Sequence, residues 1–149
     1  MNVRIQHEDF DVAAEIAALK HSSSNAGAVV TFTGIVRPDD GIQSLILEHY
    51  PGMTEREIAR HIEEAQSRWP GIAVRVLHRV GMLAPGDNIV FVGVAASHRK
   101  AAFEAAEFLM DYLKTRAPFW KQETRESSTG WVEARQSDEA ALSRWRHED

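Results

Sequence analysis

The chain of 149 residues contains no cysteine. This absence excludes disulfide bonds, thiolate nucleophiles, and zinc or iron–sulfur centres held by cysteine. Any sulfur chemistry would need a sulfur atom from another molecule. The seven histidines form no compact ligand pattern such as H-E-x-x-H. We therefore expect no metal and no bound cofactor.

Long apolar runs are also absent. No segment approaches the roughly 18 apolar residues of a membrane-spanning helix, and the N-terminal residues lack the apolar core of a secretory signal. The glycines match neither the G-x-x-x-x-G-K-[ST] nor the G-x-G-x-x-G nucleotide-binding loop. These absences predict a cytoplasmic protein without membrane contact.

Basic residues are in the minority, with 17 Lys and Arg against 22 Asp and Glu and a formal net charge of -5. A broadly basic surface that coats nucleic acid is thereby excluded, whereas a local anion-binding pocket is not. The composition, 44% hydrophobic and 26% charged, is that of a globular protein. Because the chain shows no repeat or linker, its length predicts one domain over residues 1–149.

The N-terminal part of the chain predicts alternating strands and helices. Residues 3–6 favour a strand, and Asp9 or Asp11 is suited to cap the helix that follows. Residues 27–37 are rich in Val, Thr, Phe and Ile, which is typical of a strand buried on both faces. A turn and then the alternation in residues 43–50 predict that these two segments form an antiparallel hairpin.

A helix and a second strand pair are predicted in the middle of the chain. Thr54 and Glu57 have the spacing of a capping box that opens a helix. Apolar alternation over 74–80 and 89–94, separated by a Pro-Gly-Asp turn, predicts another antiparallel hairpin.

The C-terminal part predicts a long helix. Ser97 is suited to cap this helix, and Pro118 prevents its continuation. One or two short strands and a helix from Asp138 follow. Hairpins with helices between them predict an α+β two-layer sandwich of antiparallel hairpins and packed helices, rather than a doubly wound sheet.

One candidate site is the start of this long helix. His98, Arg99 and Lys100 place cations beside free backbone N–H groups at a helix N-terminus, which suits a phosphate or carboxylate ligand. Solvated side chains that tolerate a small electrostatic penalty are the alternative. The two interpretations have equal support from the sequence.

A second candidate is the pair Lys114 and Lys121, which lie seven residues apart across a helix end and a proline bend. Lysine is scarce, with four residues against thirteen arginines. Apolar surroundings beside Phe119 and Trp120 would favour a neutral amine that can act as acid, base or nucleophile. Alternatively, Lys114 and Arg116 complement the negative end of the helix, and the aromatic residues are core. Spacing alone favours this second interpretation.

Several separated motifs occur in a fixed order: Phe32-Thr33-Gly34-Ile35-Val36-Arg37, Glu48-His49-Tyr50-Pro51-Gly52-Met53-Thr54, residues 81–94, Ser97-His98-Arg99, residues 110–121 and Trp131-Val132-Glu133-Ala134-Arg135. From about residue 3 to Trp145 the chain resembles the molybdopterin synthase catalytic (large) subunit, the MoaE family. The resemblance implies an α/β hammerhead-type fold. It also implies a homodimer within a heterotetramer.

The resemblance implies a sulfur-transfer function. In such an enzyme, a small ubiquitin-like subunit ends in a Gly-Gly thiocarboxylate, and this tail inserts into a pocket of the large subunit. It donates sulfur twice to cyclic pyranopterin monophosphate, which yields the dithiolene of molybdopterin. A chain without cysteine is consistent with a sulfur atom carried by the partner.

Functional residues carried over from the resemblance are mainly basic. Lys114 and Lys121 match the active-site lysines, while Arg37, His98 and Arg99 match contacts to the anionic substrate. The resemblance implies that Lys114 stabilises charge or transfers protons and that Lys121 orients the substrate or the partner tail. A covalent adduct at either lysine stays open. His98 and Arg99 are expected to serve the neighbouring subunit.

Further residues match less specific parts of the site. Segments that contact substrate through backbone groups or shape contain Ile35, Val36, Gln122 and Glu123. Residues expected to shape the tail channel, with core packing as the alternative, are Phe32, Met110, Pro118 and Phe119. One departure is the loop Pro38-Asp39-Asp40-Gly41, since its aspartates would repel a phosphate unless they point outward.

Two other classes of function are compatible with the basic residues. A non-catalytic α+β module could bind a phosphorylated ligand or an acidic peptide tail through the same cluster. In that case Lys114→Ala would lower the affinity for the ligand roughly in proportion, whereas in an enzyme it would lower turnover much more than binding. In a purely structural dimer, Arg37, His98 and Lys121 would be replaceable without consequence.

Overall fold

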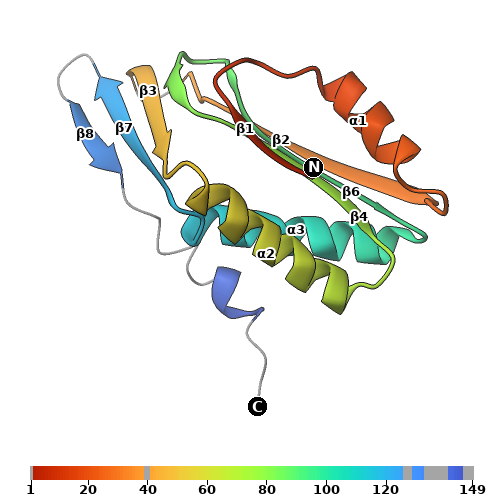
Figure 1. Ribbon diagram of the computed structural model, residues 1–149. Helices are drawn as coiled ribbons and strands as arrows, with labels where there is room; N and C mark the ends of the chain where they lie inside the picture. The colour runs from red at the N-terminus through yellow and green to blue at the C-terminus, as the bar shows by residue number, and fades with distance from the viewer. Residues whose placement is uncertain (1, 39–40, 126–128, 133–140, 146–149) are drawn as a thin grey trace.

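In the part of the chain that the structure describes, two four-stranded sheets and the helices packed on them form the fold. The computed structural model describes residues 2–38, 41–125, 129–132 and 141–145. Figure 1 shows the main sheet between helices, with the second sheet projecting from one end. The arrangement confirms the predicted mixed α+β fold.

The main sheet has the strand order β1-β4-β6-β2. Its strands are β1 (Val3–Gln6), β4 (Ala73–Arg79), β6 (Asn88–Ala96) and β2 (Ala28–Ile35). β1 is parallel to β4, and the β4–β6 and β6–β2 pairs are antiparallel. The first predicted strand and the antiparallel pairing of the β4 and β6 segments are therefore confirmed.

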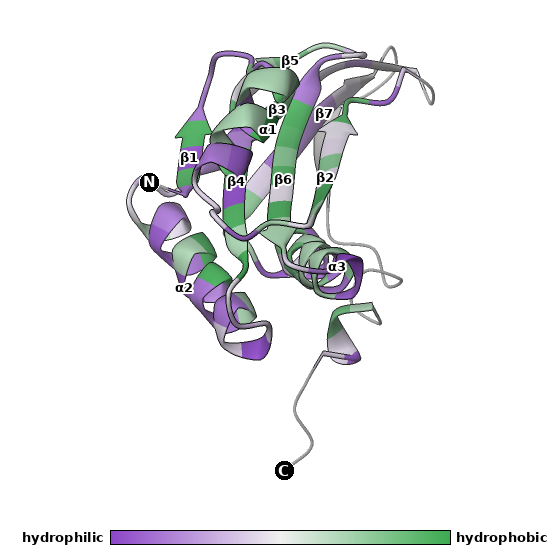
Figure 2. Ribbon diagram, turned by 90° about the vertical axis from the view of Figure 1, so that its right-hand side faces the viewer, coloured by the Kyte–Doolittle hydropathy of each residue, from purple (hydrophilic) through white to green (hydrophobic). Residues whose placement is uncertain are grey.

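Helices cover both faces of the main sheet. They are α2 (Met53–Arg68) and α3 (Arg99–Thr115) on one face and α1 (Val12–His21) on the other. Successive residues of β6 point to opposite faces, so Val92 joins a core with Ile62 and Leu109, whereas Phe91 contacts Phe10 near α1. Figure 2 shows hydrophobic residues along most of β6, as expected for a strand buried on both faces.

The second sheet begins where β2 and α3 end. It has the order β5-β3-β7-β8 and is antiparallel throughout. Its strands are β5 (Gly81–Leu83), β3 (Ile42–His49), β7 (Phe119–Arg125) and β8 (Thr129–Val132). A small core joins the two sheets and consists of Val36, Leu45, Leu47 and Leu83, with Ile89 packed against it. The predicted start of a terminal helix at Asp138 lies outside the described residues.

The strand within residues 27–37 differs from expectation in two respects. β2 forms an edge of the main sheet, and Phe32 and Ile35 are 39% and 53% exposed, so the prediction of burial on both faces is wrong. β2 pairs with β6 and not with β3, so the predicted hairpin with residues 43–50 is wrong too. Turn residues show only that the chain bends, whereas the choice of neighbouring strand depends on tertiary packing.

The start of α2 also differs from expectation. Gly52 is its N-cap, and the Glu55 carboxylate accepts a hydrogen bond from the Gly52 N–H at 3.0 Å. The predicted capping box at Thr54 and Glu57 is therefore wrong, although its helix exists. Glu57 instead forms an ion pair with Arg60 at 2.9 Å.

The ends of the other helices follow the sequence more closely. Asp11 caps α1, as predicted, through its side chain. α3 ends at Thr115, ahead of Pro118, also as predicted. Its N-cap is His98 and not Ser97, because β6 keeps the chain extended through residue 96 and the next residue serves as the connection.

Candidate active site

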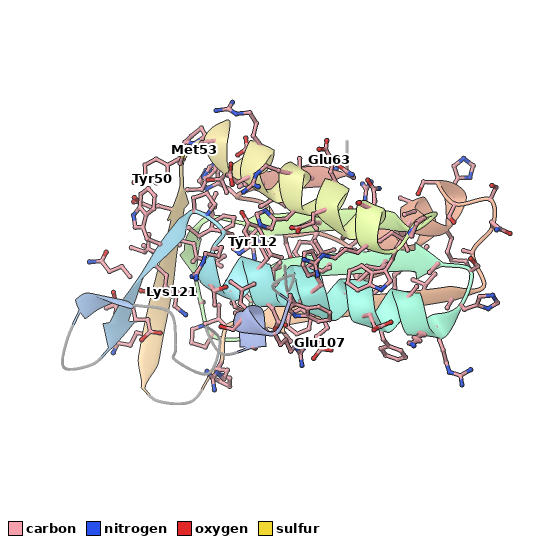
Figure 3. The ribbon with its side chains drawn as sticks, turned by 90° about the horizontal axis from the view of Figure 1, so that it is seen from below. Tyr50, Met53, Glu63, Glu107, Tyr112 and Lys121 are labelled. Atoms are coloured by element: carbon pink, nitrogen blue, oxygen red, sulfur yellow. The ribbon has the colours of Figure 1, made fainter. Side chains whose placement is uncertain are left out.

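The two candidate lysines lie at the junction between α3 and β7. Lys114 belongs to the last turn of α3, and Lys121 belongs to β7, after the bend at residues 116–118. Figure 3 shows β7 leaving the C-terminal end of α3, with Lys121 on the strand. The fold therefore places both lysines at one end of the main sheet.

The β3–β7 register determines which way Lys121 points. Lys121 and Glu123 lie directly opposite Leu47 and Leu45, and directly opposite residues share one face of a sheet. Those leucines belong to the small core between the sheets, so Lys121 and Glu123 lie on the inner face and are partly buried. Gln122 points to the outer face. The predicted contacts on β7 are thus divided between two faces.

The aromatic residues beside Lys121 are divided in the same way. Trp120 lies on the outer face, where its indole N–H donates a hydrogen bond to the Glu48 carboxylate at 3.0 Å and its ring lies 4.5 Å from the ring of Tyr50. Phe119 shares the inner face with Lys121. Of the two aromatic residues proposed from the sequence to surround the amine, only Phe119 is on the lysine's side of the strand.

Phe119 packs on a buried histidine. The rings of Phe119 and His78 are stacked, with centroids 3.9 Å apart and planes at 18°. Burial lowers the pKa of His78 from 6.5 to about 4, and the nearby charge of Lys114 acts in the same direction. The hydrogen bond between His78 Nδ1 and the Arg79 carbonyl opposes this shift. His78 is therefore neutral near pH 7 and adds no positive charge beside the lysines.

Arg37 lies at the same end of the main sheet as Lys114. Ile35, the last residue of β2, pairs with Asn88, the first residue of β6. Since α3 follows β6 and runs back along the sheet, its last turn returns toward the start of β6. The end of β2 and the end of α3 therefore bring these two cations to the same region.

The residues before Arg37 differ in what they offer to a ligand. Ile35 is 53% exposed, whereas Val36 is only 3% exposed and belongs to the small core. The Val36 N–H donates to the Asp87 carbonyl at 2.9 Å, and the Val36 carbonyl accepts from the Gly86 N–H at 2.8 Å. Val36 is thus held by the fold through both its side chain and its backbone.

His98 and Arg99 lie far from Lys114 in the same chain. They occupy the N-terminal end of α3, and Lys114 is in its last turn. At a rise of about 1.5 Å per residue, Arg99 and Lys114 are separated by about 22 Å along the helix axis. Both His98 and Arg99 are exposed. One copy of the chain therefore does not bring all the candidate cations together.

The residues proposed to shape a channel lie on three elements, β2, α3 and β7, and in the bend between the last two. Phe32 is on the edge strand β2, and Met110 lies one turn before Lys114 on the same flank of α3. The Pro118 carbonyl accepts a hydrogen bond from the Thr54 hydroxyl at 3.0 Å. This bond gives Pro118 a packing role, and the stack of Phe119 on His78 gives Phe119 one.

Sequence reasoning overlooked two residues at the lysine junction. The spacing of Thr54 and Glu57 predicts only a helix cap, and no functional motif in the sequence includes His78. No local pattern could have found them, because Thr54 contacts a residue 64 positions away and His78 stacks on Phe119 only in the folded chain.

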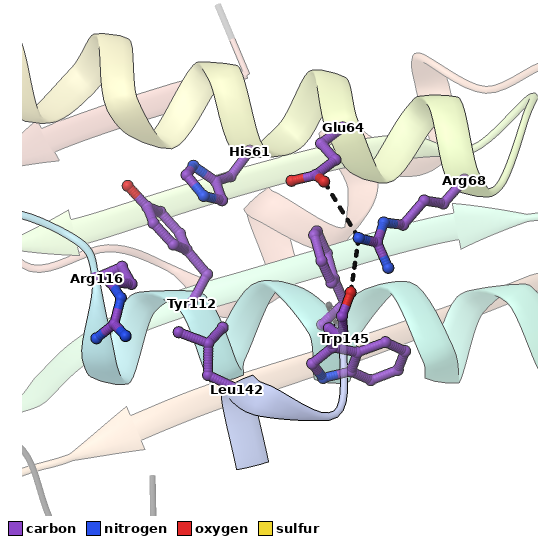
Figure 4. A pocket seen from close by; sticks show the side chains of 8 residues that line it. His61, Glu64, Arg68, Tyr112, Arg116, Leu142 and Trp145 are labelled. Atoms are coloured by element: carbon purple, nitrogen blue, oxygen red, sulfur yellow. Dashed lines mark hydrogen bonds and ion pairs between the residues drawn. The ribbon is translucent and has the colours of Figure 1, made fainter. Parts of the chain in front are cut away.

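A cavity lies on the other flank of α3, between α2, α3 and residues 141–145. It has a volume of about 270 Å³ and is lined by His61, Glu64, Arg68, Phe108, Tyr112, Arg116, Leu142 and Trp145. Figure 4 shows the guanidinium of Arg68 donating to Glu64 at 3.2 Å and to the Trp145 carbonyl at 2.8 Å. His61 stacks on Tyr112, and burial lowers the pKa of His61 and raises that of Tyr112 to about 12. The candidate lysines do not line this cavity.

The described part of the chain contains neither a candidate metal site nor a candidate membrane-spanning helix. Within those residues, no group of three or more His, Asp or Glu side chains is arranged to hold a metal ion. Among the helices formed by the same residues, none is long and apolar enough to cross a membrane.

The fold and the candidate site define a mixed α+β protein with a lysine pair where a helix meets a second sheet. A family model described as MoaE protein matches residues 5–116, which is more than half of the chain. The chain belongs to the MoaE protein family, and the resemblance inferred from its motifs is confirmed.

Relatives match nearly the whole chain. The molybdopterin synthase catalytic subunit of Mesorhizobium japonicum is 57% identical over 147 residues, which cover 97% of this chain and 92% of that protein. The subunit of the same name from Escherichia coli K12 is 54% identical over 141 residues, 93% of each chain. The solved structure of the molybdopterin biosynthesis MoaE protein from Burkholderia ambifaria is 51% identical, has a TM-score of 0.86, and covers 99% of this chain and 100% of its own.

Proposed function

We propose that the chain is the catalytic subunit of a molybdopterin synthase, an enzyme that transfers sulfur. The observation that carries this proposal is the location of Lys114 and Lys121 on the two sides of the α3–β7 bend in a member of the MoaE family. A relative of that name is 57% identical over 97% of the chain.

The proposed sulfur donor is the thiocarboxylated Gly-Gly tail of a small ubiquitin-like subunit, and the acceptor is cyclic pyranopterin monophosphate. The thiocarboxylate sulfur forms a bond to a side-chain carbon of the pterin while a carbon–oxygen bond at that carbon breaks, and the oxygen leaves either with the opened phosphate ester or as water. Water then cleaves the bond between the acyl carbon and sulfur, so the sulfur stays on the pterin and the partner regains a carboxylate. Two transfers produce the dithiolene. Because the donor supplies the sulfur, this chain needs no cysteine.

The environments of the lysines suggest different roles. Lys114 is exposed at the end of a helix, where its ammonium can approach a reacting group and stabilise charge or transfer a proton. Lys121 is partly buried within a strand that is paired on both sides, so it is suited to orient the substrate or the partner's tail. Arg37 supplies a cation for the phosphate at the same end of the sheet.

A homodimer completes the proposed site. β2 forms an open edge of the main sheet as far as the described strands extend, and Phe32 on it is exposed. On α3, Phe103 is 60% exposed and shares a flank with Lys114. A second copy packed antiparallel along this flank would bring its His98 and Arg99 beside Lys114, because antiparallel helices juxtapose opposite ends. The site then draws residues from two chains.

The small partner is proposed to approach through a local basic region. The chain as a whole carries a formal charge of -5, so attraction of an acidic tail depends on the cations at the site and not on net charge. We also propose that the chain forms one domain over residues 1–149 and acts in the cytoplasm.

The proposal is tested by following dithiolene formation from cyclic pyranopterin monophosphate and a thiocarboxylated small subunit. Lys114→Ala and Lys121→Ala should lose turnover far more than substrate affinity. Lys20→Ala is a matched control, since Lys20 is an exposed lysine in the last turn of α1 and outside the site. Wild-type protein that binds the pterin but forms no dithiolene would instead favour the non-catalytic binding module.

A further inference from the structure

Thr54 connects three segments that meet beside the lysine pair. Its side chain is fully buried, with 0% exposed. Its hydroxyl accepts a hydrogen bond from the Tyr50 N–H at 3.0 Å and donates one to the Pro118 carbonyl at 3.0 Å. Tyr50 follows β3, Thr54 lies in the first turn of α2, and Pro118 lies in the bend between α3 and β7. Figure 3 shows Tyr50 and Met53 at this junction, near β7.

Three further backbone bonds join the bend to the end of α3 and to its own residues. The N–H groups of Arg116 and Ala117 both donate to the Tyr112 carbonyl, at 2.8 and 3.2 Å. The Phe119 N–H donates to the Ala117 carbonyl at 2.7 Å. Pro118 has no N–H, so its carbonyl is the backbone group through which this residue is tied to α2.

The Thr54 hydroxyl is not needed to cap α2. The cap is formed by Gly52 and the Glu55 carboxylate. The Thr54 N–H is also satisfied, because it donates to the Tyr50 carbonyl at 2.9 Å. The hydroxyl is therefore available to join α2 to a bend that is distant in sequence.

We propose that Thr54 is a positioning residue for sulfur transfer, whose hydroxyl holds the bend at Pro118 so that Lys114 and Lys121 keep the relative placement the reaction needs. This inference rests on the proposed function. A misplacement of about 1 Å in a reacting group can lower a rate about 100-fold. Loss of the hydroxyl therefore affects turnover more than substrate binding.

Two substitutions at this position separate the hydroxyl from the shape of the side chain. Thr54→Val keeps the branched shape but removes both hydrogen bonds, and Thr54→Ser keeps the hydroxyl. Thr115→Val is a matched control near the same lysines, because the Thr115 hydroxyl donates to the Asp111 carbonyl one turn earlier in α3 and so links no second element. Each variant is assayed for dithiolene formation at saturating thiocarboxylated small subunit, with kcat and KM for the pterin determined separately.

We expect Thr54→Val to lower kcat at least about tenfold while KM changes less than about threefold. Amide hydrogen exchange of Tyr50 should accelerate in this variant, since its N–H loses its acceptor. Thr54→Ser should retain kcat within about threefold, as should Thr115→Val. If Thr54→Val shows no cooperative thermal transition, Thr54→Ala replaces it under the same criteria.

Two results would overturn the inference. One is a kcat equal to that of the wild type in folded Thr54→Val, or in Thr54→Ala where that variant replaces it. The other is an equal loss in Thr54→Ser, because the hydroxyl would then not be the active feature. Failure of the proposed function is distinguishable, since wild-type protein would then form no dithiolene or Lys114→Ala and Lys121→Ala would keep full turnover. The inference alone fails if those two variants are inactive while Thr54→Val is not impaired.

Discussion

A mixture of two inactive variants can test whether the active site is shared between two copies of the chain. Arg99 and Lys114 lie at opposite ends of α3, about 22 Å apart. In the proposed homodimer, each site combines Lys114 of one chain with Arg99 of the other. We expect Arg99→Ala and Lys114→Ala to be nearly inactive when each is studied alone, because every site then lacks one cation.

The expected recovery follows from the symmetry of a dimer. A heterodimer of the two variants has one site with both cations intact and one site in which both are replaced. When equal amounts of the variants exchange at random, about half of the dimers are heterodimers. Half of the sites in those heterodimers are intact, so the mixture should recover about one quarter of wild-type activity.

The assay uses variants with two different affinity tags that are refolded together. Dithiolene formation is measured in the mixture and again after purification through both tags, when every dimer is a heterodimer and about half of wild-type activity is expected. Lys114→Ala mixed with Lys121→Ala is the control, because both lysines belong to the same chain's part of the site and no heterodimer can restore it. Purified heterodimers of the Arg99 and Lys114 variants without activity would refute the shared site. Recovery in the control mixture would refute the assignment of both lysines to one chain.

Three further predictions concern stability and association. Glu15→Ala should lower the free energy of unfolding by about 2 kcal/mol, because the buried Glu15 carboxylate, 7% exposed, is the ion-pair partner of both Arg4, whose side chain is half exposed, and Arg75. Thermal unfolding should show a decrease of about 4–8 °C in Tm. The unfolding free energy should fall as pH drops from 6.5 to about 4, because the unfolded chain protonates His78 before the folded chain does; His78→Gln should reduce this dependence, and an unchanged pH profile would contradict it. Association with the small subunit should weaken with added salt, and an on-rate independent of salt would exclude steering by the basic site.

Features set by nearby residues were predictable from the sequence. Asp11 caps α1 and Pro118 follows the end of α3, because both act on backbone groups within about one helical turn. The neighbours of residues 27–37 were not predictable in this way. An apolar strand is compatible with either sheet, and its pairing with β6 is decided by the core that forms on α3.

At the candidate site, too, contacts between residues close in sequence were predictable and contacts between distant residues were not. Spacing alone favoured a core role for the aromatic residues near Lys121, and Phe119 does pack on buried His78. Assignment of this segment as a strand would have placed Trp120 on the opposite face from Lys121. The contact between Thr54 and the bend has no such local signal, since the two groups meet only when α2 and α3 pack on the same sheet.

Two different parts of the fold determine where Lys114 and Lys121 lie. Lys121 is fixed by the register of β7 between β3 and β8, whereas Lys114 is an exposed residue at a helix end. The bend at residues 116–118 sets the position of one lysine relative to the other, and the buried Thr54 hydroxyl holds that bend against α2. Because the partner is proposed to bring the sulfur, this chain acts by placing charge, and charge stabilises a transition state only when it is positioned in advance. Replacement of a residue that never touches the substrate, such as Thr54, should therefore also lower kcat.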